Sequence, residues 1–180
     1  MTVETEPTVA RPALPAHPAP ALELPLVGGG TFRLSEQRPA RFTMLVFNRG
    51  LHCPVCQAQL RELERRLDEL VEHGLHVVSI SGETASRAMR MRDEWGVRRV
   101  PLAYGLSEAR MREWGLFVSR GIADDEPPVF NEPALFLIRP DGTIYYASIL
   151  SMPVGRPRLD DLLRGIDYWS AHDYPARGGD

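Results

Sequence analysis

The sequence predicts an α/β fold in which a central mixed sheet is flanked by helices on both faces. Two observations predict this class. Apolar runs of strand length alternate with helical periodicity through most of the 180-residue chain, which is typical of parallel strands joined by crossover helices. Two later apolar runs straddle Arg139-Pro140-Asp141-Gly142, a strong hairpin signal. The sheet is therefore expected to combine parallel and antiparallel strands.

The first expected elements lead to the only cysteines in the chain. Residues 22–26 and 31–34 flank a run of three glycines, which predicts a short hairpin at the entrance to the domain. Residues 42–47 (FTMLVF) are almost continuously apolar, as expected of a strand that is buried on both faces. After the cysteines, leucines at helical spacing predict one long amphipathic helix that ends at Gly74.

The remaining elements complete the alternation. Each is predicted from its apolar period and from glycine or proline at its boundaries. In order, we expect strand 75–81, helix 84–95, strand 100–104, helix 107–114, an irregular segment 116–132, strands 134–138 and 143–149, and a last helix starting at Pro157.

One domain is expected at residues 22–173, between two less structured ends. Residues 1–21 contain five prolines, early acids and no apolar stretch. This composition predicts a flexible Pro/Ala-rich arm, or an arm that wraps a partner subunit, and no secretory signal. Cytoplasmic residence is then the default expectation. Pro175 and two glycines interrupt any helix in residues 174–180, which are expected to form a C-terminal tail.

Composition argues against several classes of function. The formal net charge of −3 gives no electrostatic basis for binding nucleic acid or an anionic membrane. No apolar run approaches the ~20 residues of a membrane-spanning helix. All 21 cationic residues are arginine, so a Schiff-base lysine and a phosphate-binding loop of the Walker type are both excluded.

The strongest motif is Cys-Pro-Val-Cys, formed by Cys53 and Cys56 where a buried strand leads into a helix. Cys53 is expected at the N-cap, with Pro54 as the first helical residue. Side chains three positions apart on a helix lie ~5–6 Å apart at Cβ, so a small adjustment allows a disulfide. Free amides and the helix dipole favour a thiolate at Cys53, and Arg49 and His52 are candidates to add positive charge. These features predict a redox centre in which Cys53 attacks and Cys56 resolves.

Alternatives for the pair remain open at this stage. Cys53, Cys56 and His52 together offer a soft site for copper(I) or zinc, as in a metal chaperone, although the other histidines are scattered. A redox-inert interaction domain, in which the cysteines only pack, is a further alternative. Haem attachment is excluded because Gln57 stands where a histidine is needed. No cofactor is predicted. His52 either tunes the thiolate or covers the edge of the motif.

The segments FNRGLHCPVC and EPALFLIRPDGTIYY resemble the peroxiredoxin-like branch of the thioredoxin-fold superfamily, which contains alkyl hydroperoxide reductases and thiol-specific antioxidant proteins. The resemblance implies a thioredoxin-like fold with an N-terminal β-hairpin extension. It implies an antioxidant thiol-disulfide oxidoreductase that acts on a disulfide or a hydroperoxide. The expected reductant is a thioredoxin-like protein or a low-molecular-weight thiol, and a homodimer is a plausible assembly.

The resemblance also implies a cis-proline before a central strand, and Pro133 matches that position; a trans proline at the strand entry is the alternative. Such a proline shapes the substrate groove. The chain departs from the family pattern at Val46 and Gly50, where peroxiredoxins typically carry proline and threonine. Pro133 also stands where they use an arginine, for which Arg49 is the candidate substitute. The Cys-x-x-Cys spacing resembles thioredoxin and glutaredoxin sites, so the chain looks like a hybrid.

Overall fold

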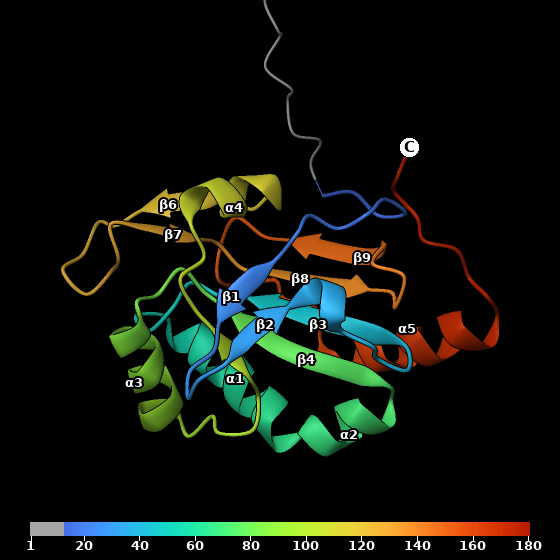
Figure 1. Ribbon diagram of the computed structural model, residues 1–180, viewed down its shortest axis with the longest axis horizontal. Helices are drawn as coiled ribbons and strands as arrows, with labels where there is room; N and C mark the ends of the chain where they lie inside the picture. The colour runs from blue at the N-terminus through green and yellow to red at the C-terminus, as the bar shows by residue number, and fades with distance from the viewer. Residues whose placement is uncertain (1–12) are drawn as a thin grey trace, which may run out of the picture.

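The computed structural model describes residues 13–180, and a five-stranded mixed sheet lies at its centre (Figure 1). The strand order is β5-β4-β3-β8-β9. The first three of these strands run parallel, whereas β8 pairs antiparallel with β3 and β9 pairs antiparallel with β8. This is the predicted mixed sheet. Its strands are β3 (Phe42–Phe47), β4 (Leu75–Ile80), β5 (Leu102–Ala103), β8 (Ala134–Ile138) and β9 (Ile144–Ile149).

Each face of the sheet has its own core, because successive side chains of a strand point to opposite faces. On β3, Met44 and Val46 pack toward one cluster, whereas Leu45 and Phe47 pack toward the other. The first cluster is covered by α1 (Pro54–Arg65), α2 (Leu67–Glu72), α3 (Ala85–Trp95) and α5 (Leu159–Ala171). The second is covered by β1 (Glu23–Pro25), β2 (Thr31–Arg33), the 3-10 turn Leu34–Glu36 and α4 (Glu108–Glu113). None of the helices in residues 13–180 has the length and apolar character needed to cross a membrane.

Three elements differ from the sequence-based expectation. The helix after the cysteines breaks at Arg66, whose φ of −103° and ψ of 14° end α1 before α2 begins. The segment expected to be irregular contains a hairpin of β6 (Val118–Arg120) and β7 (Val129–Asn131), whose three-residue strands are too short to show a period. The last helix begins at Leu159 rather than Pro157.

The N-terminal segment at residues 13–21 packs on the fold instead of extending as a solvated arm. The N–H of Ile144 donates to the carbonyl of His17 at 2.9 Å, which joins this segment to the start of β9. A ring nitrogen of His17 also lies 2.9 Å from the carbonyl oxygen of Gly179, so the C-terminal tail is held at the same place. The rest of the expected arm, residues 1–12, lies outside the described residues.

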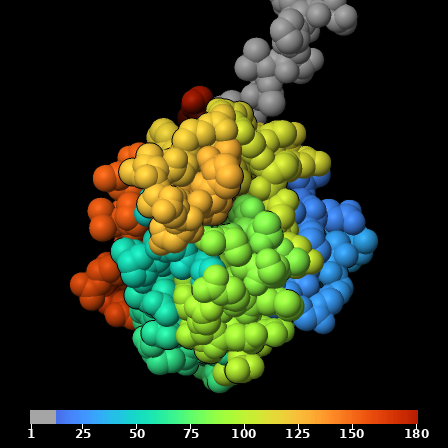
Figure 2. Space-filling model, turned by 90° about the vertical axis from the view of Figure 1, so that its left-hand side faces the viewer, coloured from blue at the N-terminus to red at the C-terminus, as the bar shows by residue number. Residues whose placement is uncertain are grey.

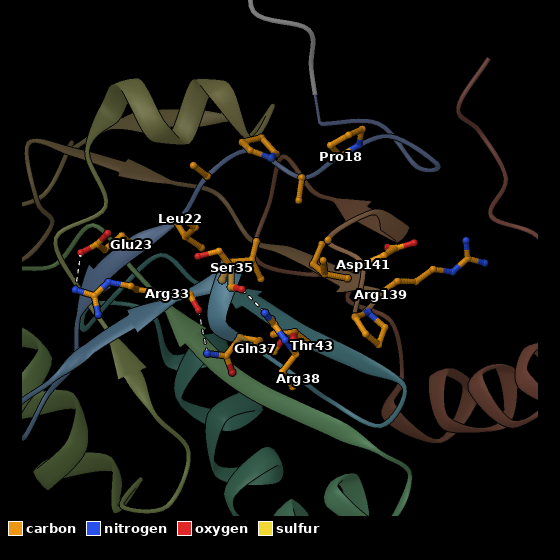
Figure 3. A pocket seen from close by; sticks show the side chains of 17 residues that line it. Pro18, Leu22, Glu23, Arg33, Ser35, Gln37, Arg38, Thr43, Arg139 and Asp141 are labelled. Carbon is orange, nitrogen blue, oxygen red and sulfur yellow. Dashed lines mark hydrogen bonds and ion pairs between the residues drawn. The ribbon is translucent and has the colours of Figure 1, made fainter.

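A surface cavity of about 510 Å³ lies between the N-terminal segment, the residues after β2 and the turn that joins β8 to β9 (Figure 3). Arg33 and Glu23 form an ion pair at its rim, at 3.1 Å, and Asp141 lies on the opposite side. The lining contains neither cysteine and none of the other predicted site residues. The cavity is therefore separate from the cysteine motif.

Candidate active site

The loop between β3 and α1 is built around a buried carboxylate. Asn48 is fully buried, and its amide donates to the hydroxyl of Ser79 at 2.8 Å, which ties the loop to the end of β4. Gly50 follows with φ of +110°, and a Cβ there would overlap the carboxylate of Glu83. That carboxylate accepts the N–H of Leu51 at 2.8 Å. Glycine is required at this position because a side chain would displace the group that holds the loop.

Cys53 is the N-cap of α1, with Pro54 as the first helical residue, and its sulfur accepts the backbone N–H of Cys56 at 3.2 Å. The pKa of Cys53 is lowered to about 6, chiefly because the Cys56 thiol donates a hydrogen bond to its sulfur. Burial opposes this shift, while the Cys56 N–H and the positive charges of Arg156 and Arg49 add to it. Cys53 is therefore mainly a thiolate at neutral pH.

Cys56 has the opposite ionisation. Its side chain is fully buried, and burial raises the pKa of its thiol far above the usual range. The hydrogen bond to Cys53 and the negative charge there raise the pKa further, whereas Arg156 lowers it. Two donors reach the Cys56 sulfur, the guanidinium Nη2 of Arg156 at 3.1 Å and the backbone N–H of Arg49 at 3.4 Å. One helical turn thus holds a thiolate beside a protonated thiol, both free.

Both cysteines are closed off from solvent in this conformation. Cys53 is 1% exposed and Cys56 is 0% exposed. Two loops close over the motif. Residues 121–128 bring in Glu126, and residues 150–158 bring in Arg156. Figure 2 shows the β6–β7 hairpin in gold, overlying the teal segment where α1 begins. A substrate therefore reaches Cys53 only when one of these loops or its side chains moves.

Arg49 turns its side chain away from the sulfurs and toward two carboxylates. Its Nε lies 3.2 Å from Glu132 Oε2, and its Nη2 lies 3.8 Å from Glu126 Oε1. The guanidinium carbon also lies 5.0 Å from the centre of the Phe130 ring. Its charge is largely balanced by these carboxylates and is a minor cause of the lowered pKa of Cys53, whereas its backbone N–H donates to the sulfur of Cys56.

His52 is packed beside the same aromatic ring. Its side chain is 3% exposed, and its ring centre lies 4.7 Å from that of Phe130. Burial lowers the pKa of His52, and the positive charge of Arg49 lowers it further. The ring is therefore neutral at neutral pH. It covers the edge of the motif and adds no positive charge to Cys53.

Comparison of the sequence with models of known protein families identifies the family of this chain. The model of the AhpC/TSA family matches residues 15–147, which is most of the chain. The chain belongs to the AhpC/TSA family. Its members are thiol-dependent peroxidases and oxidoreductases, and thiol-dependent oxidoreduction is the function of this chain as well. No curated protein matches the sequence.

Solved structures of low identity share the fold of this AhpC/TSA protein. A reduced 2-Cys peroxiredoxin of Plasmodium vivax superimposes with a TM-score of 0.74 at 18% identity, covering 90% of this chain and 84% of its own. AhpC of Mycobacterium bovis gives 0.73 at 15% identity, covering 90% and 95%. A peroxiredoxin-like protein of Aquifex aeolicus gives 0.70 at 15% identity, covering 88% and 90%. These matches confirm the thioredoxin-like fold predicted from the sequence.

The expectation of a cis-proline at Pro133 is wrong, because no peptide bond in residues 13–180 is cis. Pro133 is instead a buried trans proline at the entrance to β8. Glu132, the residue before it, is held by hydrogen bonds of its backbone and of its side chain. The N–H of Glu132 donates to the carbonyl of Phe117 at 2.8 Å, and its carboxylate accepts the hydroxyl of Ser119 at 2.7 Å. These bonds fix the residue that enters β8, and the bond to Pro133 is trans, which is the ordinary state of such a bond.

The sequence did not indicate four charged residues that this AhpC/TSA protein brings to the motif. Arg156 lies 100 positions after Cys56 and is one of 21 arginines, with no local pattern to distinguish it. The three acids lie on loops, where no periodic pattern links them to the cysteines. They are Glu83, Glu126 and Glu132.

The metal-binding alternative is not favoured. It requires a third ligand near the two cysteines, and His52 was the candidate. Across the described part of the chain, no group of three or more histidine, cysteine or acidic side chains is arranged to hold a metal ion. His52 instead lies against Phe130 and Glu126.

Proposed function

We propose that Cys53 is the attacking thiolate and Cys56 the resolving thiol in the reduction of a hydroperoxide or a disulfide. The observation that carries this assignment is the opposite ionisation of two thiols within one helical turn. Cys53 has a pKa lowered to about 6, while Cys56 stays protonated and donates to it. The thiolate is the attacking species in both reactions.

The reaction balances without a cofactor. The Cys53 thiolate attacks the terminal oxygen of a hydroperoxide, an S–O bond forms, the O–O bond breaks, and the alkoxide leaves and takes a proton. Cys56 then loses its proton and attacks the oxidised Cys53 sulfur. An S–S bond forms, the S–O bond breaks, and hydroxide leaves as water. With a disulfide as substrate, Cys53 forms a mixed disulfide that Cys56 resolves in the same way.

Four further residues support this site in distinct ways. Pro54 fixes the first turn of α1, so that the Cys56 N–H points at the Cys53 sulfur. Arg49 donates its N–H to Cys56 and adds a weaker positive charge beside Cys53. His52 shields the motif with its buried ring. Pro133 lines a small cavity beside Arg156, where a substrate would lie once the site opens.

A thiol must reduce the Cys53–Cys56 disulfide to complete the cycle. We propose a thioredoxin-like protein or a low-molecular-weight thiol in this role, which places the protein in the reducing cytoplasm. We also propose a homodimer, since β9 lies at one edge of the sheet and an edge strand is a place where a second copy can pair. Sedimentation of the purified protein tests the assembly, and a single monomeric species contradicts it.

The functional assignment is tested by replacing each cysteine with serine. Reduced protein is mixed with hydrogen peroxide or a model disulfide, and turnover is followed with thioredoxin and its reductase or with glutathione. Cys53→Ser is expected to abolish turnover with every substrate. Cys56→Ser is expected to stop after one equivalent and to leave Cys53 as a sulfenic acid or a mixed disulfide, identified by mass. Turnover by Cys53→Ser at the wild-type rate overturns the assignment.

A further inference from the structure

The guanidinium of Arg156 faces the sulfur of Cys56, whereas that of Arg49 faces two carboxylates. It lies in the irregular segment between β9 and α5, and it is half-buried. Its guanidinium is held in place by the carbonyl of Pro153 at 3.0 Å and by the side-chain oxygen of Gln59. The remaining donor, Nη2, lies 3.1 Å from the sulfur of Cys56.

Among the residues that the structure describes, no carboxylate balances this charge. Within residues 13–180, Arg156 makes no ion pair, and all three of its contacts are to neutral groups. Arg49, by contrast, is paired with Glu132 and Glu126. A half-buried cation without a carboxylate partner is costly unless a nearby thiol is negative, as Cys53 is at rest and as Cys56 must become when it attacks.

We propose that Arg156 activates Cys56 for the resolving step, by holding its guanidinium against the sulfur that must become negative when it attacks oxidised Cys53. Cys56 is fully buried, and burial is the largest cause that opposes its ionisation. The step forms the S–S bond and breaks the S–O bond of the Cys53 sulfenic acid, and the proton that Cys56 loses leaves with the released hydroxide as water. Arg156 supplies the charge that makes this loss possible, and it acts directly on the reacting sulfur. The inference rests on the proposed function, in which Cys56 is the resolving thiol.

Three groups act on the Cys56 sulfur. Cys53, on the same helix, opposes ionisation while it is a thiolate, and that opposition ends when Cys53 is oxidised. Arg49 contributes a backbone N–H, which favours the anion. Arg156, from the 150–158 segment, contributes both a hydrogen bond and a full charge. Oxidation of Cys53 therefore leaves Arg156 as the dominant charged neighbour, at the moment when Cys56 must ionise.

The first test needs no substrate. In the Cys53→Ser background the thiolate neighbour is gone and Cys56 is the only cysteine left. Its thiolate absorbance is measured at high pH against the cysteine-free Cys53→Ser/Cys56→Ala protein, which subtracts tyrosine ionisation. Adding Arg156→Met is expected to raise the pKa of Cys56 by at least a unit, so the thiolate fraction at a given pH falls at least ~10-fold. Arg156→Lys should restore part of the effect, and Arg158→Met, on an exposed neighbour, should leave the pKa unchanged. Equal pKa values with and without Arg156 overturn the proposal.

The second test follows the resolving step itself. Reduced protein receives one equivalent of hydrogen peroxide, and the Cys53 sulfenic acid is trapped with dimedone and counted by mass. Arg156→Met is expected to lengthen the lifetime of the sulfenic acid at least ~10-fold and to displace the pH profile of disulfide formation upward. Disulfide formation at the wild-type rate across the pH range contradicts the role of Arg156. Failure of the wild type to form sulfenic acid or disulfide contradicts the proposed function instead, while the titration still decides whether Arg156 acts on Cys56.

Discussion

Replacing Cys56 with alanine should raise the pKa of Cys53, because the Cys56 thiol is the main group that lowers it to about 6. A hydrogen bond to a charged group contributes ~1.5–3 kcal/mol, and one pKa unit corresponds to ~1.4 kcal/mol. Loss of the S–H donor alone therefore predicts a Cys53 pKa of ~7–8 in the variant. At pH 7 the thiolate fraction should fall from ~90% to ~10–50%. The backbone N–H of residue 56 remains as a donor, which keeps the pKa below its ordinary value.

The assay is a titration of thiolate absorbance together with the pH dependence of alkylation by iodoacetamide. Cys56→Ser is the matched variant, since its hydroxyl keeps a donor at the same place and should give a smaller shift than alanine. The double variant Cys53→Ser/Cys56→Ala, which has no cysteine, gives the background from tyrosine ionisation. A wild-type Cys53 pKa near 9.0 would refute the reasoning about the whole site. An unchanged pKa in Cys56→Ala would show that the helix amides and arginines, and not the thiol, set the ionisation.

Three further outcomes follow from the geometry of the loop before Cys53. Gly50→Ala should lower the free energy of unfolding by ~1–3 kcal/mol from the backbone alone, and by more because its Cβ overlaps Glu83. Arg49→Met should cost ~3–5 kcal/mol in urea unfolding, because it leaves the buried carboxylate of Glu132 without its cation. For the reduced protein, the unfolding free energy relative to Cys53→Ser should rise from pH 6 to 9. Folded Cys53 binds fewer protons than unfolded Cys53 in that window, so its contribution is complete above pH 9 and is lost as the pH falls through 6.

Control variants for the Gly50 and Arg49 predictions, and a contradicting result for the pH dependence, make these three outcomes decisive. Gly142→Ala changes a glycine with φ of +86° that has open space around it, so it isolates the backbone cost from the overlap at Gly50. Equal losses at the two positions contradict the steric account. Arg49→Lys keeps the charge and should lose less stability than Arg49→Met. A difference between the wild type and Cys53→Ser that stays flat from pH 6 to 9 contradicts the lowered pKa.

The central part of the site could be predicted from the sequence because its signals are local. A continuous apolar run, a proline at the first helical position and a leucine period after it are all within about twenty residues of the cysteines. Together they placed Cys53 at the N-cap of a helix that begins at Pro54, where the structure has it. The alternation of strand and helix patterns, together with the hairpin signal at residues 139–142, likewise predicted the mixed sheet.

The charged surroundings of the motif could not be predicted, because they come from residues that are distant in sequence and have no periodic signal. From the sequence, Arg49 was a candidate for the cation that lowers the pKa of Cys53. In the structure its guanidinium forms an ion pair with Glu132, 83 positions later. Arg156 reaches Cys56 through an irregular segment whose course depends on how β9 and α5 pack. The cis-proline expectation failed for a similar reason. The hydrogen bonds that fix Glu132 at the entry to β8 come from Phe117 and Ser119 on a hairpin that the sequence did not show.

In the proposed mechanism, the direction of α1 decides which cysteine attacks. The N-cap position gives Cys53 a backbone donor from Cys56, and the helix dipole favours its negative charge. The position one turn inside gives Cys56 complete burial, which keeps it protonated and therefore able to donate to Cys53. The Cys56 thiol thus keeps Cys53 ionised, and the Cys53 thiolate keeps Cys56 protonated, until Cys53 is oxidised and loses its negative charge. Cys56 then loses the neighbour that opposed its ionisation and keeps the arginine that favours it, so the electrostatics of the first turn of α1 and of Arg156 account for the order of the two proposed steps.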